Sequence, residues 1–228
     1  MIEFDLDQSD VRELNAALHN SDIAKNQSKW KVRNTKGRHA IAVGIDETLE
    51  MLIDGHVGYY CAGMNKHANI TVNGHCGPGV AENMMSGTVR IKGNASQYAG
   101  ATAHGGLLVI EGDASSRCGI SMKGVDIVVK GNVGHMSAFM AQKGCLVVCG
   151  DAGDALGDSL YEARLYVRGK VASLGADCIE KPMKLEHKAE LKELLKQANL
   201  SDINVDEFHR YGSARTLYNF NIDNVGAY

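Results

Sequence analysis

Apolar residues in the middle of the chain recur with a period of 19 residues. One apolar position of each repeat holds Met51, Ile70, Val89, Leu108, Ile127, Leu146 and Leu165. A second position, two residues further along, holds Ile53, Val72, Ile91, Ile110, Val129, Val148 and Val167. The next residue is polar in every repeat except at Cys149. Apolar residues spaced two apart, beside polar neighbours, predict a β-strand with one buried face in each repeat.

Each predicted strand leads into a glycine, which we interpret as a corner. The corner glycines are Gly55, Gly74, Gly93, Gly112, Gly131, Gly150 and Gly169. We expect them to adopt a positive φ and to leave no space for a side chain against the adjacent coil. Seven residues after each corner the chain has only Gly or Ala, at Ala62, Ala81, Gly100, Gly119, Ala138, Gly157 and Ala176. At that position we expect backbone to pack against backbone.

This repeat predicts an all-β fold. A strand, a corner, a small apolar residue and a second tight corner describe one coil of a β-helix. We predict a right-handed parallel β-helix of seven coils of 19 residues over residues 46–180. Coils about 4.8 Å apart would form a rod roughly 30–35 Å long. One coil cannot bury its own apolar face, so both ends of the rod need caps.

Residues 1–45 are predicted to form an N-terminal α/β cap. The alternation from Ile2 to Leu6 is typical of a strand, and Ser9 or Asp10 can cap a short helix that follows. The segment from Trp30 to Val43 predicts a hairpin leading into the first coil.

Residues 181–228 are predicted to form a C-terminal amphipathic helix and tail at the other end. The helix runs from Lys184 to Asn199, and a polar tail from Ser213 to Tyr228 packs on the rod or on a partner. Four lysines lie on one stripe of this helix: Lys184, Lys188, Lys192 and Lys196. Interspersed glutamates favour a solvated face, and a docking strip for an acidic partner is the alternative.

Composition narrows the function. The 228 residues include 26 Gly and only 2 Pro, which is neither a collagen nor a disordered composition. A net charge of −3 gives no basic face for nucleic acid, and no apolar run approaches the roughly 18 residues that span a bilayer. The N-terminus lacks a signal-peptide pattern, and the six cysteines include no C-x-x-C pair. We expect a cytoplasmic protein with reduced thiols that binds neither nucleic acid nor membrane.

The sequence offers little catalytic or ligand chemistry. Residues 55–58 and 150–157 look like phosphate-binding loops, but neither has the Lys-Ser/Thr of a Walker loop or a helix after it. His56 and His75 stack one coil apart, which is a weak indication of a metal site. No G-x-S-x-G elbow appears, and 19 is not a multiple of the six-residue unit of β-helical acyltransferases. We therefore expect no catalytic, cofactor-binding or metal-binding residue in this chain.

One strip of residues fits an isolated rod poorly. Successive coils place methionines and a few polar groups at similar positions, which is typical of a protein interface. The candidate interface residues are Tyr59, Tyr60, Met64, Glu82, Asn83, Met84, Arg117, Met122, Lys123 and Gln142. Replacing Met84 and Met122 with Asp is predicted to release a partner while the rod stays folded.

Particular segments point to a family. The 19-residue coils with AENMMSG (81–87), GATAHGG (100–106) and GISMKG (119–124) resemble the GXGXG β-helix domain of glutamate synthase over residues 40 to 180. With its tail GSARTLYNF (212–220), the chain is similar to the stand-alone β-helix subunit of methylamine–glutamate N-methyltransferase, also called N-methylglutamate synthase.

The resemblance implies a scaffold without catalytic residues or cofactors of its own. It would join a class II glutamine-amidotransferase-like subunit to an FMN- and iron–sulfur-binding synthase-like subunit. That complex would form N-methyl-L-glutamate from L-glutamate and methylamine, releasing ammonia. The alternatives are a β-helix subunit of glutamate synthase, of an uncharacterised amidotransferase complex, or of a formylmethanofuran-dehydrogenase-like complex. A self-sufficient carbohydrate-active or acyltransferase β-helix is a further alternative.

Overall fold

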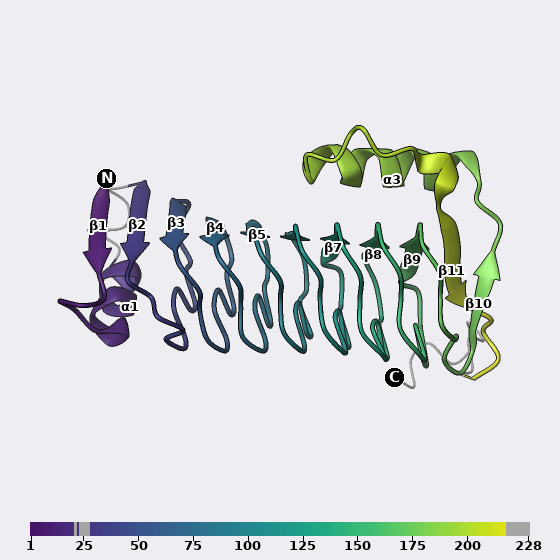
Figure 1. Ribbon diagram of the computed structural model, residues 1–228, viewed down its shortest axis with the longest axis horizontal. Coiled ribbons are helices and arrows are strands. Elements are labelled where there is room, and N and C mark those ends of the chain that lie inside the picture. Colours follow the sequence, from purple (N-terminus) through teal and green to yellow (C-terminus); the bar gives the residue numbers. More distant parts are fainter. Residues whose placement is uncertain (21, 23–27, 218–228) are drawn as a thin grey trace.

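The computed structural model describes residues 1–20, 22 and 28–217. Strands stack side by side along a rod and form one sheet (Figure 1). The strands of the regular coils are β3 (Glu50–Asp54), β4 (Asn69–Asn73), β5 (Thr88–Ile91), β6 (Leu107–Ile110), β7 (Asp126–Val129), β8 (Cys145–Val148) and β9 (Arg164–Val167). Neighbours are parallel and pair at the 19-residue period, as Met51 pairs with Ile70 and Leu146 with Leu165. The predicted all-β parallel solenoid is confirmed.

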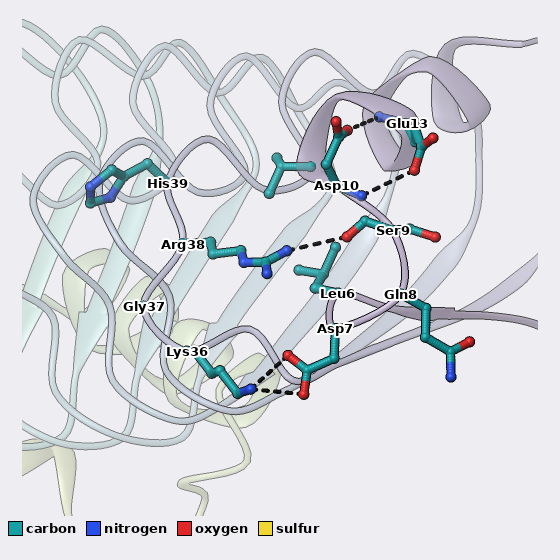
Figure 2. Close-up of a pocket in the computed structure, with 11 residues that line it drawn as sticks. Leu6, Asp7, Gln8, Ser9, Asp10, Glu13, Lys36, Gly37, Arg38 and His39 are labelled. Carbon is teal, nitrogen blue, oxygen red and sulfur yellow. Dashed lines mark hydrogen bonds and ion pairs between the residues drawn. The ribbon is translucent and has the colours of Figure 1, made fainter.

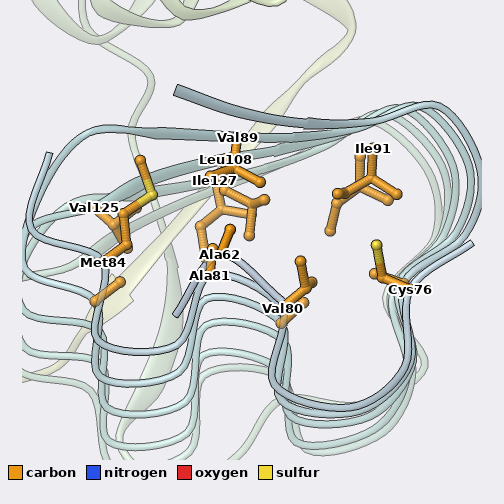
Figure 3. Close-up of a cluster of buried hydrophobic side chains, with 14 of the residues drawn as sticks. Ala62, Cys76, Val80, Ala81, Met84, Val89, Ile91, Leu108, Val125 and Ile127 are labelled. Atoms are coloured by element: carbon orange, nitrogen blue, oxygen red, sulfur yellow. The ribbon is translucent and has the colours of Figure 1, made fainter. Parts of the chain in front are cut away.

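The core of the rod is made of columns of like side chains. Val89, Leu108 and Ile127 are fully buried and lie above one another in successive coils (Figure 3). Ile91 belongs to the second inward column, which faces Cys76 across the coil. Each buried aliphatic side chain stabilises the fold by about 1.5–3 kcal/mol, so the stacking of coils supplies what a single coil cannot.

An additional coil precedes the seven regular ones. The chain begins with β1 (Ile2–Asp5), α1 (Val11–His19) and β2 (Lys29–Arg33). β1 pairs in parallel with β2, and β2 pairs in parallel with β3, placing Trp30 opposite Met51. The N–H of Gly37 donates to the carbonyl of His56 in the next coil at 2.9 Å. The predicted Trp30–Val43 hairpin is therefore wrong, because this segment is a coil two residues longer than the others, and the solenoid starts before residue 46.

α1 packs at the N-terminal end of the rod. Asp10 is its N-cap: Oδ1 accepts the N–H of Glu13 at 2.8 Å, and Glu13 Oε2 accepts the N–H of Asp10 at 3.0 Å. This reciprocal pair is a capping box, which satisfies two helix-end donors. Leu14 and Leu18 of α1 are buried in the core. The predicted strand, cap residue and short helix are confirmed.

Two antiparallel strands close the other end of the sheet. β10 (Cys178–Lys181) and β11 (His209–Ser213) pair with each other, and β11 also pairs with β9. The last coil is one residue short, because Leu156 pairs with Leu174. Ala176 is consequently exposed instead of occupying the tight Gly/Ala position predicted for it.

α3 (Leu185–Gln197) covers a flank of the rod instead of its end. It runs back along the coils over the outer face of β6 to β9 (Figure 1). Leu191, Leu194 and Leu195 pack there against outward side chains, which include Val109, Val128, Val147 and Tyr166. Arg90 fixes the far end of α3 by donating to the carbonyls of Gln197 and Ala198 at 3.1 and 2.9 Å. The short 3₁₀ helix η1 (Val205–Glu207) follows, and no helix among the described residues is long and apolar enough to cross a membrane.

Glycine is required at the corners because a side chain would have no space there, and less because of the backbone conformation. Of the seven, only Gly55 has a positive φ, +118°. A Cβ on Gly112 would lie 2.1 Å from Asn94 Oδ1 and 2.8 Å from the Gly93 oxygen in the preceding coil. The expectation of a positive φ is thus wrong for six corners, and the expectation of crowding is confirmed.

At the Gly/Ala position, seven residues after each corner glycine, backbone conformation is the main restriction. Gly100 has φ +67° and Ala81 has φ +57°, so the left-handed conformation restricts this position. A Cβ on Gly100 would meet the side chain of Ile127 at 2.6 Å. The restriction therefore comes from backbone conformation and core side chains, and the predicted backbone-to-backbone packing is not what limits it.

Candidate functional site

A ladder of side-chain acceptors runs along the corner of the rod. The residue after each of the first six corner glycines accepts the backbone N–H of its equivalent in the next coil, at 2.7–3.0 Å. The accepting residues are His56, His75, Asn94, Asp113, Asn132 and Asp151. Lys170 donates the last of these N–H groups. The ladder has a structural role, and its sequence signal is the His, Asn or Asp that follows each of the first six corner glycines.

The two histidines that suggested a metal site belong to this ladder. The rings of His56 and His75 stack with centroids 4.8 Å apart. Nδ1 of His56 accepts the N–H of His75, and Nδ1 of His75 accepts the N–H of Asn94. Within the described part of the chain, no group of three or more His, Cys, Asp or Glu side chains is placed to hold a metal ion.

The cysteines are poorly suited to nucleophilic chemistry. All six are free and buried. Burial raises the pKa of Cys61 and of Cys118 to about 12, and that of Cys149 to about 11. A thiol must be deprotonated to act as a nucleophile or metal ligand, so these thiols act as small core side chains.

A hollow of about 790 Å³ lies where the start of α1 meets the first coil (Figure 2). Its polar groups serve structural contacts. Lys36 Nζ is 2.6 and 2.7 Å from the carboxylate oxygens of Asp7, Arg38 Nη1 donates to the Ser9 carbonyl at 3.2 Å, and Asp10 caps α1. Nothing here pairs a nucleophile with a base, so this hollow is not a candidate active site.

The structure divides the predicted interface residues into three groups. Tyr59, Met64, Lys123 and Gln142 are exposed, and the Tyr59 and Met64 side chains have exposed fractions of 52% and 45%. Tyr60, Glu82, Asn83 and Arg117 are half-buried at the surface. Met84 and Met122 are fully buried.

Met84 and Met122 must therefore be removed from the predicted interface. They share an inward position, and Figure 3 shows Met84 pointing into the core beside Val125. Asp at either site would break the core, so the prediction that the rod stays folded is wrong. Two exposed methionines of the same coils, Met85 and Met140, are not among the candidate interface residues given above; they are 44% and 37% exposed. We call the exposed and half-buried set Tyr59, Tyr60, Met64, Glu82, Asn83, Met85, Arg117, Lys123, Met140 and Gln142 the methionine strip.

Backbone hydrogen bonds hold the methionine strip across coils. The N–H of Met64 donates to the Glu82 carbonyl at 2.8 Å, and Met64, Asn83 and Met140 occupy equivalent left-handed positions with φ between 52° and 56°. This conformation is rare for non-glycine residues, and here it turns three long or polar side chains outward.

Two half-buried charged groups of the methionine strip, Glu82 and Arg117, have no oppositely charged partner among the described residues. Burial raises the pKa of Glu82, and no ion pair or side-chain hydrogen bond involves its carboxylate among the described residues. The Arg117 guanidinium lies over the Tyr98 ring at 6.0 Å and 4.0 Å from the sulfur of Met136. Both groups are half-buried and have no compensating charge among the described residues, which is the state expected of groups that a partner surface would cover.

Three of the four lysines in the stripe of α3 lie close to a carboxylate of this chain. Lys188 is 2.6 Å from Asp206, Lys184 is 3.9 Å from Glu186, and Lys196 is 3.8 Å from Glu193. These distances favour the solvated-face interpretation over a docking strip for an acidic partner.

The fold and these surfaces define a β-solenoid whose polar corners serve coil stacking. Protein GlxC of Rhizobium meliloti (strain 1021) is 64% identical to this chain over 224 residues, which is 98% of each protein. The chain therefore belongs to the family of Protein GlxC. No family model and no solved structure matches it.

Proposed function

We propose that this chain is a non-catalytic scaffold subunit of a glutamate-synthase-like enzyme, namely N-methylglutamate synthase. It would join an amidotransferase-like subunit to an FMN- and iron–sulfur-binding synthase-like subunit. The complex would convert L-glutamate and methylamine into N-methyl-L-glutamate and ammonia. The scaffold would hold the two subunits in fixed geometry, so that a reactive amine passes between them without escaping to water.

The observation that carries the proposal is the methionine strip. Met64, Met85 and Met140 expose flexible apolar side chains that adapt to a partner surface. Glu82 and Arg117 add a half-buried charge of each sign, and the exposed Lys123 adds a second cation. A partner that presents a cation to Glu82 and a carboxylate to Arg117 would complete both groups, and such pairs provide specificity more than affinity.

The chemistry of the remaining side chains supports the same proposal. The histidines and carboxylates of the corner are engaged as backbone acceptors, and the thiols are buried. The segments at 81–87, 100–106 and 119–124, which resemble the GXGXG domain, lie on the regular coils of the solenoid. A β-helix subunit of glutamate synthase or of a formylmethanofuran-dehydrogenase-like complex is the alternative, and identification of the partner subunits separates these choices.

Replacing exposed methionines in the strip tests the partner-binding role. Met64→Asp, Met85→Asp and Met140→Asp should each weaken retention of a partner when the complex is purified through this chain. The melting temperature of the isolated chain should stay unchanged, because these side chains are exposed. Leu185→Asp is the matched control, because Leu185 is an 85% exposed apolar residue on α3. Full retention in all three strip variants would refute the assignment of this surface.

A further inference from the structure

A polar pocket of about 280 Å³ lies at the C-terminal end of the rod, one coil beyond the end of the methionine strip: the N–H of Glu162, which lines the pocket, donates to the carbonyl of Gln142 at 2.8 Å. It is bordered by the end of β10, by β11, by the first turn of α3 and by residues 161–164 before β9. Four cationic side chains line it: Arg164, Lys181, Arg210 and Arg215. Glu162 is the carboxylate among its lining residues.

Two of the four cations already have a carboxylate partner. Arg164 forms two hydrogen bonds with Glu190, Nε to Oε2 at 2.8 Å and Nη2 to Oε1 at 2.6 Å. Arg215 Nη2 lies 2.8 Å from Glu162. These pairs orient both guanidinium groups and leave the pocket with the charge of Lys181 and Arg210.

The other two cations face each other across the strand pair. Lys181 and Arg210 are directly opposite in the β10–β11 ladder, where like charges are unfavourable. Arg210 Nε donates to the Pro182 carbonyl at 3.1 Å, and neither residue has an ion pair with a carboxylate among the described residues. The buried Gly212, two residues further along β11, lies beside the lysine stem, since a Cβ there would be 3.6 Å from the Lys181 Cδ. The sheet thus holds two positive charges together without a counter-charge.

His187 lies in the first turn of α3 and lines this pocket. Its pKa is lowered first by burial and then by the positive charge of Arg210, while the carboxylates of Glu186 and Glu190 act in the opposite direction. The N-terminal end of α3 adds a positive partial charge on the same side, since helix dipoles point that way. Hydrogen-bond donors from guanidinium and ammonium groups surround a space with room for a handful of non-hydrogen atoms, whereas the Ser213 hydroxyl already donates to Asp177 at 2.6 Å.

We propose that this pocket binds a small dianion, either a phosphoryl group or a short dicarboxylate. Lys181 and Arg210 bind its charge directly, and Arg164 and Arg215 supply donors from the pocket wall. The dianion relieves the repulsion between Lys181 and Arg210 and ties β10, β11 and α3 together. The proposal is independent of the function proposed above.

Titration of the full chain with inorganic phosphate and, separately, with succinate tests the proposal. The readouts are the melting temperature and isothermal titration calorimetry, with sodium chloride at matched ionic strength as the reference. Saturable stabilisation by either anion supports the proposal, and the stronger response identifies the chemical class. A response to both anions no larger than that to chloride overturns it.

Three variants separate a specific site from general charge screening. Lys181→Met and Arg210→Gln should each weaken anion binding at least about tenfold, because each removes a charge-assisted hydrogen bond. Lys181→Met should also leave the melting temperature of the unliganded protein unchanged or higher, because it removes the like-charge pair. Lys130→Met, an exposed lysine just after β7, is the control and should bind as the unmodified chain does. Unchanged affinity in both pocket variants, or equal loss in the control, contradicts the assignment.

Discussion

Gly112→Ala is the sharpest test of how the coils stack. The new Cβ would lie 2.1 Å from Asn94 Oδ1 and 2.8 Å from the Gly93 oxygen in the preceding coil. The Asn94 side chain could swing away, but its Oδ1 accepts the N–H of Asp113 at 3.0 Å, so this ladder hydrogen bond would be lost. The carbonyl of Gly93 cannot move without shifting the coil.

The magnitude follows from these contacts. A lost hydrogen bond costs about 0.5–1.5 kcal/mol, and overpacking costs about 1–3 kcal/mol. Lower entropy of the unfolded chain returns about 0.4–1 kcal/mol, because φ of Gly112 is outside the left-handed region. We expect a net destabilisation of about 2–3 kcal/mol, which for a chain of this size lowers the melting temperature by roughly 5–10 °C.

The assay is thermal and urea unfolding of Gly112→Ala, Asn94→Ala and the double variant. Because Asn94→Ala removes the nearest obstructing atom, the double variant should be less destabilised than the sum of the single variants by about 1 kcal/mol. An unchanged melting temperature in Gly112→Ala, or strict additivity, would refute the explanation by crowding.

Three further predictions address the ladder, the core and a buried carboxylate. His75→Asn keeps an acceptor for the N–H of Asn94, whereas His75→Leu removes it. In urea unfolding, the His75→Leu variant should therefore be about 0.5–1.5 kcal/mol less stable than the His75→Asn variant. Equal stability of the two variants would exclude the ladder hydrogen bond as a contributor. Met122→Asp should lower the free energy of unfolding by several kcal/mol, because Met122 is buried. Met85→Asp should change it by less than about 0.5 kcal/mol, because Met85 is exposed. Similar thermal melts of the two variants would contradict the assigned inward and outward positions. Burial raises the pKa of Asp126, so the native state holds its proton to higher pH than the unfolded state does, and this group makes the protein more stable as pH falls through the raised pKa. Asp126→Asn should therefore raise the melting temperature at pH 7 and remove this dependence, provided that the amide keeps the hydrogen bond to the Cys145 N–H; a lower melting temperature at pH 7 would contradict it.

The regular coils could be predicted from the sequence because each inward position is occupied by the same type of residue in every coil. The first coil could not be predicted from the 19-residue period, because Trp30 pairs with Met51 at a spacing two residues longer than that period. The sequence also contains a signal for the position of α3 on the flank of the rod. Outward positions that are Lys31, Leu52, Thr71 and Arg90 in early strands, three of them polar, become Val109, Val128 and Val147 under the helix.

The candidate site was predicted less well, because its turns do not follow the two-residue alternation of a strand. Tyr60, Ala62 and Met64 are all left-handed, and equivalent positions of later coils repeat this conformation. Such a turn decides which methionine faces inward, so Met84 is buried and Met85 exposed although they are adjacent. Sequence alone gives no φ for these residues, and the error at Met84 and Met122 follows from that.

The most direct test of the proposed scaffold function is purification of this chain under native conditions from its own source. We predict that an amidotransferase-like chain and a flavin-bearing synthase-like chain accompany it, and that the assembly forms N-methylglutamate from L-glutamate and methylamine. Recovery of the chain by itself, or an active assembly that keeps full activity without it, would contradict the scaffold function.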